Sequence, residues 1–233
     1  MTVSIRPGTI ADEDDLSHIC LLTANFGTSA VDIVSFPKLP GHIYVEPYLR
    51  LKSTYSFVLV DTDVIQNSSY SAPLAHDERI VGYIVGAADT REFERDAKDI
   101  WWPKLCAQYG HLREPAASVD LKSGELQYIN RLFGPRIAAD ATIAFAPAHM
   151  HINILPEYQG KGYGRQLVGA AVRYLGSLDE GDGVDERRIK GLWLHINPQN
   201  TKAAAFYARL GFGPFEDAPE EMIGLRFEDW GQG

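Results

Sequence analysis

The chain has 233 residues, of which 45% are hydrophobic and 23% charged, so it can bury one substantial core and is not a disordered chain. It has no apolar run long enough to cross a membrane, and its start lacks the apolar segment of a secretory signal. The formal net charge of −9 argues against nucleic acid as the main partner and weakly favours a cationic or neutral substrate.

The first third of the chain combines strand and helix patterns. Strands show as short β-branched or alternating runs, and the first helix has acidic residues in its first turn. Pro37, Pro40 and Gly41 are expected to break any long element in the region between the two helices. The expected elements are strands at 3–7, 55–60 and 79–85 and helices at 12–22 and 47–52, with a polar loop at 61–78.

A long connection follows, from about 89 to 148. Its first half has a helical apolar stripe that runs from Phe93 to Tyr109, and Pro103 is expected to kink or restart this helix. A second short helix is expected at 125–132. Two interpretations stay open, a lid over a binding pocket and a cap or oligomer contact.

The segment 152–165 combines a short β-branched run with three glycines at alternate positions. An apolar-periodic helix follows, and Gly176 is expected to end it. A strand, a series of glycine amides and a helix N-terminus together form an anion-binding site that suits a pyrophosphate. Lys161 and Arg165 add positive charge there, and a plain strand-to-helix turn is the alternative.

A second strand-and-helix block spans 192–212. Asn200 is expected to cap the helix, Phe206 and Tyr207 recur at helical spacing, and Gly211 follows as its stop. The stretch 179–188 before this block is predicted to be a solvated charged loop. Residues 222–227 are predicted to form the last strand, which pairs in a closing hairpin.

Neither block matches the familiar nucleotide loops, because the glycine spacing differs from the dinucleotide fingerprint and no Gly-Lys-Ser/Thr ends the loop. The series Gln159, Gly162 and Gly164 resembles the acyl-CoA loop of the GNAT N-acetyltransferases, which reads Gln/Arg, two residues, Gly, one residue, Gly/Ala. The segment from Asn200 through Tyr207 to Phe212 resembles the second motif of this family, Asn-x-x-Ala-x-x-x-Tyr-x-x-x-Gly-Phe. Both motifs stand in the family's order.

The resemblance implies an α/β (α+β) fold for one domain over residues 1–233. In the GNAT fold a mixed, mostly antiparallel sheet of about seven strands is flanked by helices and splayed between strands 4 and 5. The family usually joins its third and fourth strands by a short turn, so 89–148 is an insertion before strand 4. If the insertion is a lid, it covers the acceptor pocket.

The resemblance also implies acetyl-CoA as cosubstrate and the residues that bind it. The fourth strand would pair with the pantetheine amides, the glycine loop would hold the pyrophosphate, and Asn200 would bind the pantetheine arm. The implied cofactor-binding residues are Ile152, Asn153, Ile154, Gln159, Gly160, Lys161, Gly162, Tyr163, Gly164, Arg165, Asn200 and Tyr207.

The implied reaction is direct acetyl transfer to a primary amine of a small molecule or a peptide. Tyr207 would protonate the leaving thiolate, and a backbone N–H near Ile154 would stabilise the oxyanion. In N-terminal acetyltransferases with the closest second motif, a glutamate stands five residues before the asparagine. Here His195 stands there as the expected base. His149 and His151, on one face of the fourth strand, are rivals, and each histidine has a structural alternative.

Some expectations concern partners and location. The wording of the fourth strand, from His149 to Pro156, is similar to small acetyltransferases related to the acetyltransferase-like domain of O-GlcNAc hydrolases, where the cofactor residues are degraded. A catalytically inactive acetyl-CoA-binding or scaffold module is therefore the alternative function. Two cysteines, Cys20 and Cys106, are too few for a disulfide framework and predict a reduced, cytoplasmic protein, with nuclear entry left open. No metal, nucleic acid or membrane partner is expected, and a homodimer stays open.

Overall fold

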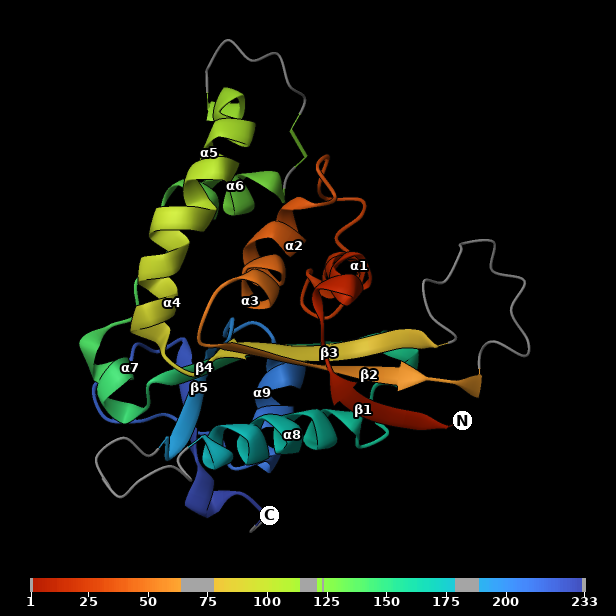
Figure 1. The fold of residues 1–233 in the computed structure, drawn as a ribbon, viewed down its shortest axis with the longest axis vertical. Coiled ribbons are helices and arrows are strands. Elements are labelled where there is room, and N and C mark those ends of the chain that lie inside the picture. Colours follow the sequence, from red (N-terminus) through yellow and green to blue (C-terminus); the bar gives the residue numbers. More distant parts are fainter. Residues whose placement is uncertain (1, 64–77, 114–120, 123, 179–188, 232–233) are drawn as a thin grey trace.

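The computed structural model describes residues 2–63, 78–113, 121–122, 124–178 and 189–231. Its centre is a six-stranded sheet in the order β1-β2-β3-β4-β5-β6 (Figure 1). Neighbouring strands are antiparallel except β4 and β5, which are parallel. The strands are β1 (Val3–Pro7), β2 (Thr54–Asp61), β3 (Arg79–Ala87), β4 (Ala148–Ile154), β5 (Gly191–His195) and β6 (Met222–Arg226).

The mixed, mostly antiparallel sheet is as predicted, but the described part of the chain has six strands where about seven were expected. Gly213 pairs with Gly224 of β6 only as an isolated bridge. The next residue, Pro214, has no N–H to continue a ladder, so this segment does not become a further strand. The predicted final strand is present as β6, which pairs with β5.

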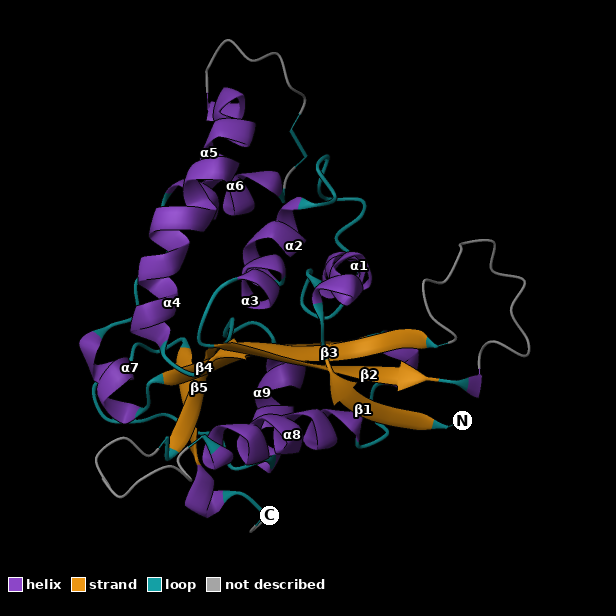
Figure 2. Ribbon diagram, viewed as in Figure 1, coloured by secondary structure: helices purple, strands orange, loops and turns teal. Residues whose placement is uncertain are grey.

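Helices cover both faces of the sheet (Figure 2). The helices of one face, called here the α1–α3 face, are α1 (Glu13–Thr23), α2 (Leu39–Tyr44) and α3 (Glu46–Arg50). The opposite face carries α8 (Tyr163–Ser177) and α9 (Thr201–Arg209). The predicted apolar face of α8 is buried, with Leu167, Val168 and Leu175 fully inaccessible. No described helix is both long and apolar enough for a bilayer crossing.

Strands β4 and β5 separate soon after they begin to pair. They are in register only at Ala148↔Leu192 and His149↔Trp193, so the rest of β4 has no partner strand on that side. The amide of Leu155 donates to Val81 O of the β3 side (2.9 Å). Because alternate residues point their N–H and C=O to opposite edges of a strand, Ile152 and Ile154 direct theirs into the gap.

The connection before β4 is mainly helical, as predicted. Its elements are α4 (Thr90–Asp96), a π-helical turn (Ala97–Trp101), α5 (Trp102–Tyr109), a 3-10 turn (Gly110–Arg113), α6 (Glu125–Phe133) and α7 (Asp140–Phe145). Pro103 lies in the first turn of α5, where its missing N–H needs no helical acceptor, so the helix restarts there. The short α7 was not predicted.

Three further local predictions have different outcomes. Residues 39–44 form α2 although Pro40 and Gly41 were expected to break this region, because Pro40 lies in the first turn, where proline is tolerated. Gly176 does not end α8, which continues to Ser177. Gly211 does follow the end of α9 with φ 92°. The predicted loop 61–78 lies largely, and the predicted loop 179–188 entirely, outside the described residues.

Glu125 at the start of α6 anchors the insertion to the N-terminal third of the chain. Its carboxylate is fully buried and accepts hydrogen bonds from the amides of Ser35 (2.9 Å) and Phe36 (2.7 Å). A buried acceptor that loses its partner costs about 1–3 kcal/mol. This contact therefore fixes α6 against the loop that precedes α2.

We expect Glu125→Gln to lower the free energy of unfolding by about 1–3 kcal/mol, because one carboxylate oxygen becomes an NH₂ group that faces N–H donors. Urea denaturation followed by circular dichroism measures this. The neighbouring Leu126 is 57% exposed, and Leu126→Ala, as the control, should stay within about 0.5 kcal/mol of the parent. Equal stability of Glu125→Gln and the parent would contradict the anchoring role.

Candidate active site

A large cleft of about 2040 Å³ passes through the gap between β4 and β5. Its walls come from α1, α2, the insertion, the open edge of β4 and α9, so both ends of the chain contribute to it. The cleft brings together the two sequence motifs and the three candidate histidines. The insertion forms part of the wall on the α1–α3 face, through Tyr128 and Arg131 of α6.

The open edge of β4 offers backbone groups to a ligand. Ile152 and Ile154 point their N–H and C=O groups into the gap, and the Gln159 side chain donates to Ile154 O (2.8 Å). Asn153 differs from these two, because its backbone faces Tyr83 of β3 and its carboxamide donates to the Tyr83 hydroxyl (2.9 Å). A chain of amides along this edge can be matched by an extended ligand as if a strand were added.

The edge leads to a glycine turn at the start of α8. Gly160 (φ 71°) and Gly162 (φ 82°) have left-handed backbone, which favours glycine. The helix begins at Tyr163, and its first N–H groups have no acceptor within the helix. The turn is fixed to β2 by the Tyr158 hydroxyl, which donates to the buried Asp61 carboxylate (2.7 Å). These amides and the helix dipole make an anion site.

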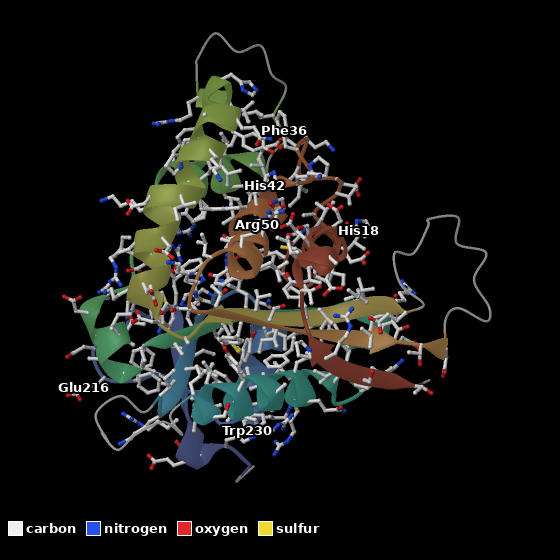
Figure 3. The ribbon with its side chains drawn as sticks, viewed as in Figure 1. His18, Phe36, His42, Arg50, Glu216 and Trp230 are labelled. Carbon is white, nitrogen blue, oxygen red and sulfur yellow. The ribbon has the colours of Figure 1, made fainter. Side chains whose placement is uncertain are left out.

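The two cations of this loop both lie against aromatic rings. The Lys161 ammonium is 5.4 Å from the centre of the Tyr158 ring. The Arg165 guanidinium is 5.2 Å from the ring of Trp230 (Figure 3), near the C-terminus. Both side chains are exposed at the surface.

Gly164 has a structural reason to be glycine. A Cβ at this position would lie 2.7 Å from the Phe206 ring of α9. Gly160 and Gly162 have open space instead, and their requirement is the positive φ angle. The three motif glycines thus serve two different purposes, the turn itself and the packing of α8 on α9.

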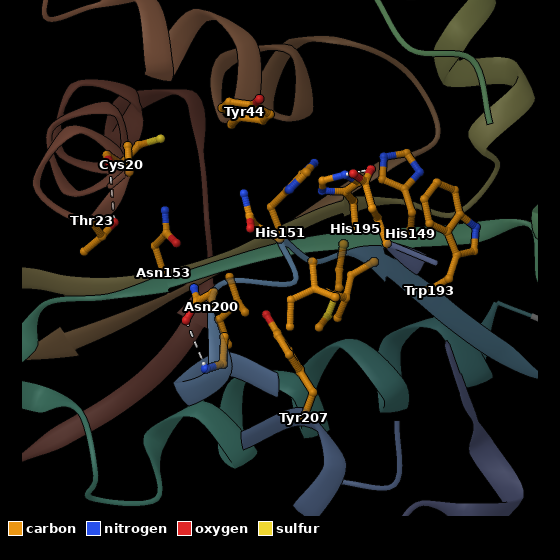
Figure 4. A pocket seen from close by; sticks show the side chains of 18 of the residues that line it. Cys20, Thr23, Tyr44, His149, His151, Asn153, Trp193, His195, Asn200 and Tyr207 are labelled. Carbon is orange, nitrogen blue, oxygen red and sulfur yellow. Dashed lines mark hydrogen bonds and ion pairs between the residues drawn. The ribbon is translucent and has the colours of Figure 1, made fainter. Parts of the chain in front are cut away.

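Asn200 and Tyr207 reach the cleft from α9, below the sheet in Figure 4. The Asn200 carboxamide oxygen accepts the Ala203 amide (3.1 Å) as the predicted N-cap, which leaves its NH₂ group as a donor. The Tyr207 hydroxyl points up toward the sheet in Figure 4, and burial raises the pKa of Tyr207 well above its usual range. A tyrosine in this state carries its proton at neutral pH.

His149 is held on both sides. Thr90 Oγ1 donates to Pro147 O (2.6 Å), so it must accept from His149 Nδ1 (2.7 Å). His149 Nε2 is then the acceptor of the Tyr48 hydroxyl proton (2.9 Å). Burial, with a smaller effect of His151, lowers the pKa of His149 to about 3, so the ring is neutral. Neither nitrogen of His149 is left for a substrate.

The same network fixes the tautomer of His151. The Tyr48 hydroxyl donates its hydrogen bond to His149, so it accepts one from His151 Nε2 (3.0 Å). His151 Nδ1 therefore has the lone pair. Burial, followed by the charges of His195 and Arg131, lowers the pKa of His151 to about 4. The two β4 histidines share one face, as predicted, but Tyr48 occupies the space between their nitrogens.

His195 lies at the end of β5, where this strand has parted from β4 (Figure 4). Its Nε2 is 2.7 Å from the Glu221 carboxylate, which also pairs with Arg136 (3.3 Å). Burial lowers the pKa of His195, the Glu221 hydrogen bond acts in the opposite direction, and Arg136 and Arg131 add to the lowering. A carboxylate on Nε2 leaves Nδ1 as the basic nitrogen.

Sequence reasoning missed three residues of this arrangement. Tyr48 is 101 positions from His149, and Glu221 is 26 positions from His195, so no spacing rule joins either pair. Arg131 belongs to the insertion, which lies outside both sequence motifs, so the motifs could not predict a site residue there. Among the residues that the structure describes, no group of three or more His, Cys, Asp and Glu side chains could hold a metal ion.

Comparison with known proteins agrees with this geometry. The family model described as the acetyltransferase (GNAT) domain matches residues 134–214, which include β4, α8, β5 and α9. The crystal structure of SsHAT is 28% identical, with a TM-score of 0.69, and the match covers 97% of this chain and 99% of that one. Arabidopsis thaliana NAA60 in complex with acetyl-CoA matches at 14% identity and a TM-score of 0.49, over 97% and 99% of the two chains.

The chain therefore matches a GNAT acetyltransferase domain over residues 134–214 and has a fold similar to that of SsHAT. The GNAT class transfers acetyl groups from acetyl-CoA, and this chain resembles that class over residues 134–214. The resemblance seen in the two motifs is confirmed, and the matched segment contains the cofactor-binding residues named from them.

Proposed function

We propose that this protein transfers the acetyl group of acetyl-CoA directly to a primary amine of a small molecule or a peptide. One observation carries the proposal, namely the open edge of β4 that leads from the histidines to the glycine turn at the start of α8. An extended thioester ligand fits such an edge, with its phosphates at the turn and its acyl end at the gap.

The proposed cofactor contacts follow from this placement. Ile152 and Ile154 pair with the pantetheine amides, and the amides from Gly160 to Arg165 hold the pyrophosphate. The NH₂ group of Asn200, not used in capping, donates to the pantetheine arm. Asn153 stays a proposed cofactor contact through its side chain, because its backbone faces β3.

The proposed chemistry uses one base and one acid. His195 Nδ1 takes a proton from the acceptor amine, whose nitrogen then attacks the thioester carbonyl. A backbone N–H near Ile154 holds the oxyanion. When the C–S bond breaks, Tyr207 gives its proton to the thiolate. His195 is favoured over its rivals because Glu221 supports a positive charge on it, His149 has both nitrogens engaged, and His151 has a pKa of about 4.

The wider predictions remain part of the proposal. We propose one GNAT domain over 1–233, with the insertion at 89–148 as a wall or lid of the acceptor site. Cys20 and Cys106 are free thiols, in keeping with a reducing cytoplasm. A homodimer and nuclear entry stay open, and no nucleic acid or membrane partner is proposed.

Acetyl-CoA binding is the direct test of the cofactor site. Gly162→Val should weaken binding at least about tenfold, because a β-branched residue does not adopt the φ of 82° that aims these amides. Isothermal titration calorimetry measures it. Gly176, inside α8 with open space at its Cβ position, gives the control Gly176→Ala, which should bind like the parent. Unchanged binding by Gly162→Val would put the site elsewhere.

Tyr207→Phe should leave acetyl-CoA affinity nearly intact and lower turnover by about 10²- to 10⁴-fold, the range for a lost proton donor. Thiol release with an amine acceptor measures turnover. Tyr174→Phe, a tyrosine of α8 outside the cleft, is the matched control. Full turnover of Tyr207→Phe would rule out the acid role. Binding of acetyl-CoA without CoA release to any amine would instead support the non-catalytic module.

The base is tested through the pH dependence of kcat/KM. Protonation inactivates a base, so activity should fall as the pH drops through the pKa of His195, and His195→Ala should remove this acidic limb. Glu221→Gln removes the partner that raises the pKa of His195, so the limb should move to lower pH. His151→Gln should keep the limb. If His195→Ala keeps it and His151→Gln loses it, β4 supplies the base.

A further inference from the structure

An unmatched positive charge lines the acceptor side of the cleft. Arg131 of α6 is half-buried and lines the same cleft as Tyr44 and His151. Burial raises the pKa of Tyr44, and the Arg131 guanidinium beside its hydroxyl acts in the opposite direction. The charge of Arg131 also contributes to the lowered pKa values of His151 and His195. The guanidinium is therefore close to the proposed reaction centre.

The carboxylates of the cleft wall do not neutralise Arg131. Among the described residues that line the cleft, the acidic ones are Glu94 and Glu221. Glu94 pairs with Arg91 (2.7 Å) and Glu221 with Arg136 (3.3 Å). In the described part of the chain, no carboxylate lies within ion-pair distance of Arg131. Its identified neighbours are the neutral Tyr44 hydroxyl and, outside ion-pair distance, Glu221, whose pKa the charge of Arg131 lowers as the smallest of several causes.

The helix that carries Arg131 is held in place by a buried contact. Glu125, two turns earlier on α6, is buried and fixes this helix to Ser35 and Phe36. A half-desolvated guanidinium on a fixed helix presents several N–H donors in a plane, the geometry that carboxylates and phosphates bind. Lys98, exposed at the edge of the same cleft, adds a second positive charge.

We propose that the acceptor amine also carries an anionic group, a carboxylate or a phosphate, and that Arg131 binds this group. The proposal rests on the proposed transfer to an amine. The net charge of −9 favours a cationic or neutral substrate, whereas this proposal names an acceptor with an anionic group. The difference arises because the charges of the cleft wall are nearest to the bound substrate and act on it more strongly than the sum over the chain.

The test uses pairs of amines that differ only in the anionic group. L-tyrosine with tyramine, and β-alanine with ethylamine, examine the carboxylate. Glucosamine 6-phosphate with glucosamine examines the phosphate. For each pair, kcat/KM is measured by CoA release with saturating acetyl-CoA. The parent enzyme should prefer the anionic member of at least one pair by about tenfold or more, and the pair that shows it identifies the anion.

Arg131→Gln should lower kcat/KM for that anionic member by about 10- to 100-fold and for its neutral partner less than about twofold, as expected for one charge-assisted contact. Arg131→Lys should recover part of the preference. Because both members are measured with the same variant, loss of folded protein cancels from the ratio. Arg95→Gln, which removes an exposed charge from α4 outside the cleft wall, should retain the parent ratio.

The outcomes separate this inference from the proposed function. Acetylation of neutral and anionic amines at equal rates, or an equal loss of both in Arg131→Gln, would overturn the role of Arg131 and leave amine acetylation intact. Weaker acetyl-CoA binding by Arg131→Gln in calorimetry would also overturn it, since Arg131 would then hold the cosubstrate. If no amine releases CoA, the proposed function fails and this inference fails with it.

Discussion

The parting of β4 from β5 is the constraint on which the rest of the site depends. These strands form a parallel ladder at only two residue pairs, and the remaining β4 edge has backbone groups without a strand partner. Exposed strand edges are usually blocked, because they pair with other chains. Here the edge opens into a cleft between helices, which restricts it to an extended ligand. The same gap lets Tyr207 approach from one face and His195 from the other.

The chemistry of the gap depends on which histidine nitrogens around it already have a hydrogen-bond partner. Tyr48 and Thr90 use both nitrogens of His149 and one of His151, so a region with two buried imidazoles is neutral and ordered. His195 instead has a carboxylate partner at the surface side. Three histidines that look equivalent in sequence thus differ in their capacity to accept a proton, because their hydrogen-bond partners and burial differ.

The insertion supplies part of the cleft wall on the proposed acceptor side. It is bound to the N-terminal third through the buried Glu125 carboxylate, and it places Arg131 in the wall of the cleft that the histidines also line. The GNAT motifs contain no information about this wall, since they describe the cofactor side. In the proposed function, specificity for the acceptor depends on a segment that the motifs leave out, as expected where loops and insertions vary on a constant scaffold.

The sequence by itself determined the parts that local chemistry governs. The glycines with positive φ, the Asn200 cap, the apolar face of α8 and the strands up to β4 all follow from contacts within a few residues, and their order identified the class. Only the tertiary structure decided what depends on distant residues. Gly164 is required by Phe206 of another helix, and Tyr48 reaches histidines about a hundred positions away. The bridge at Gly213 does not grow into a further strand, because Pro214 cannot extend it. Pairings of this kind depend on how the elements pack, and packing has no signature in sequence spacing.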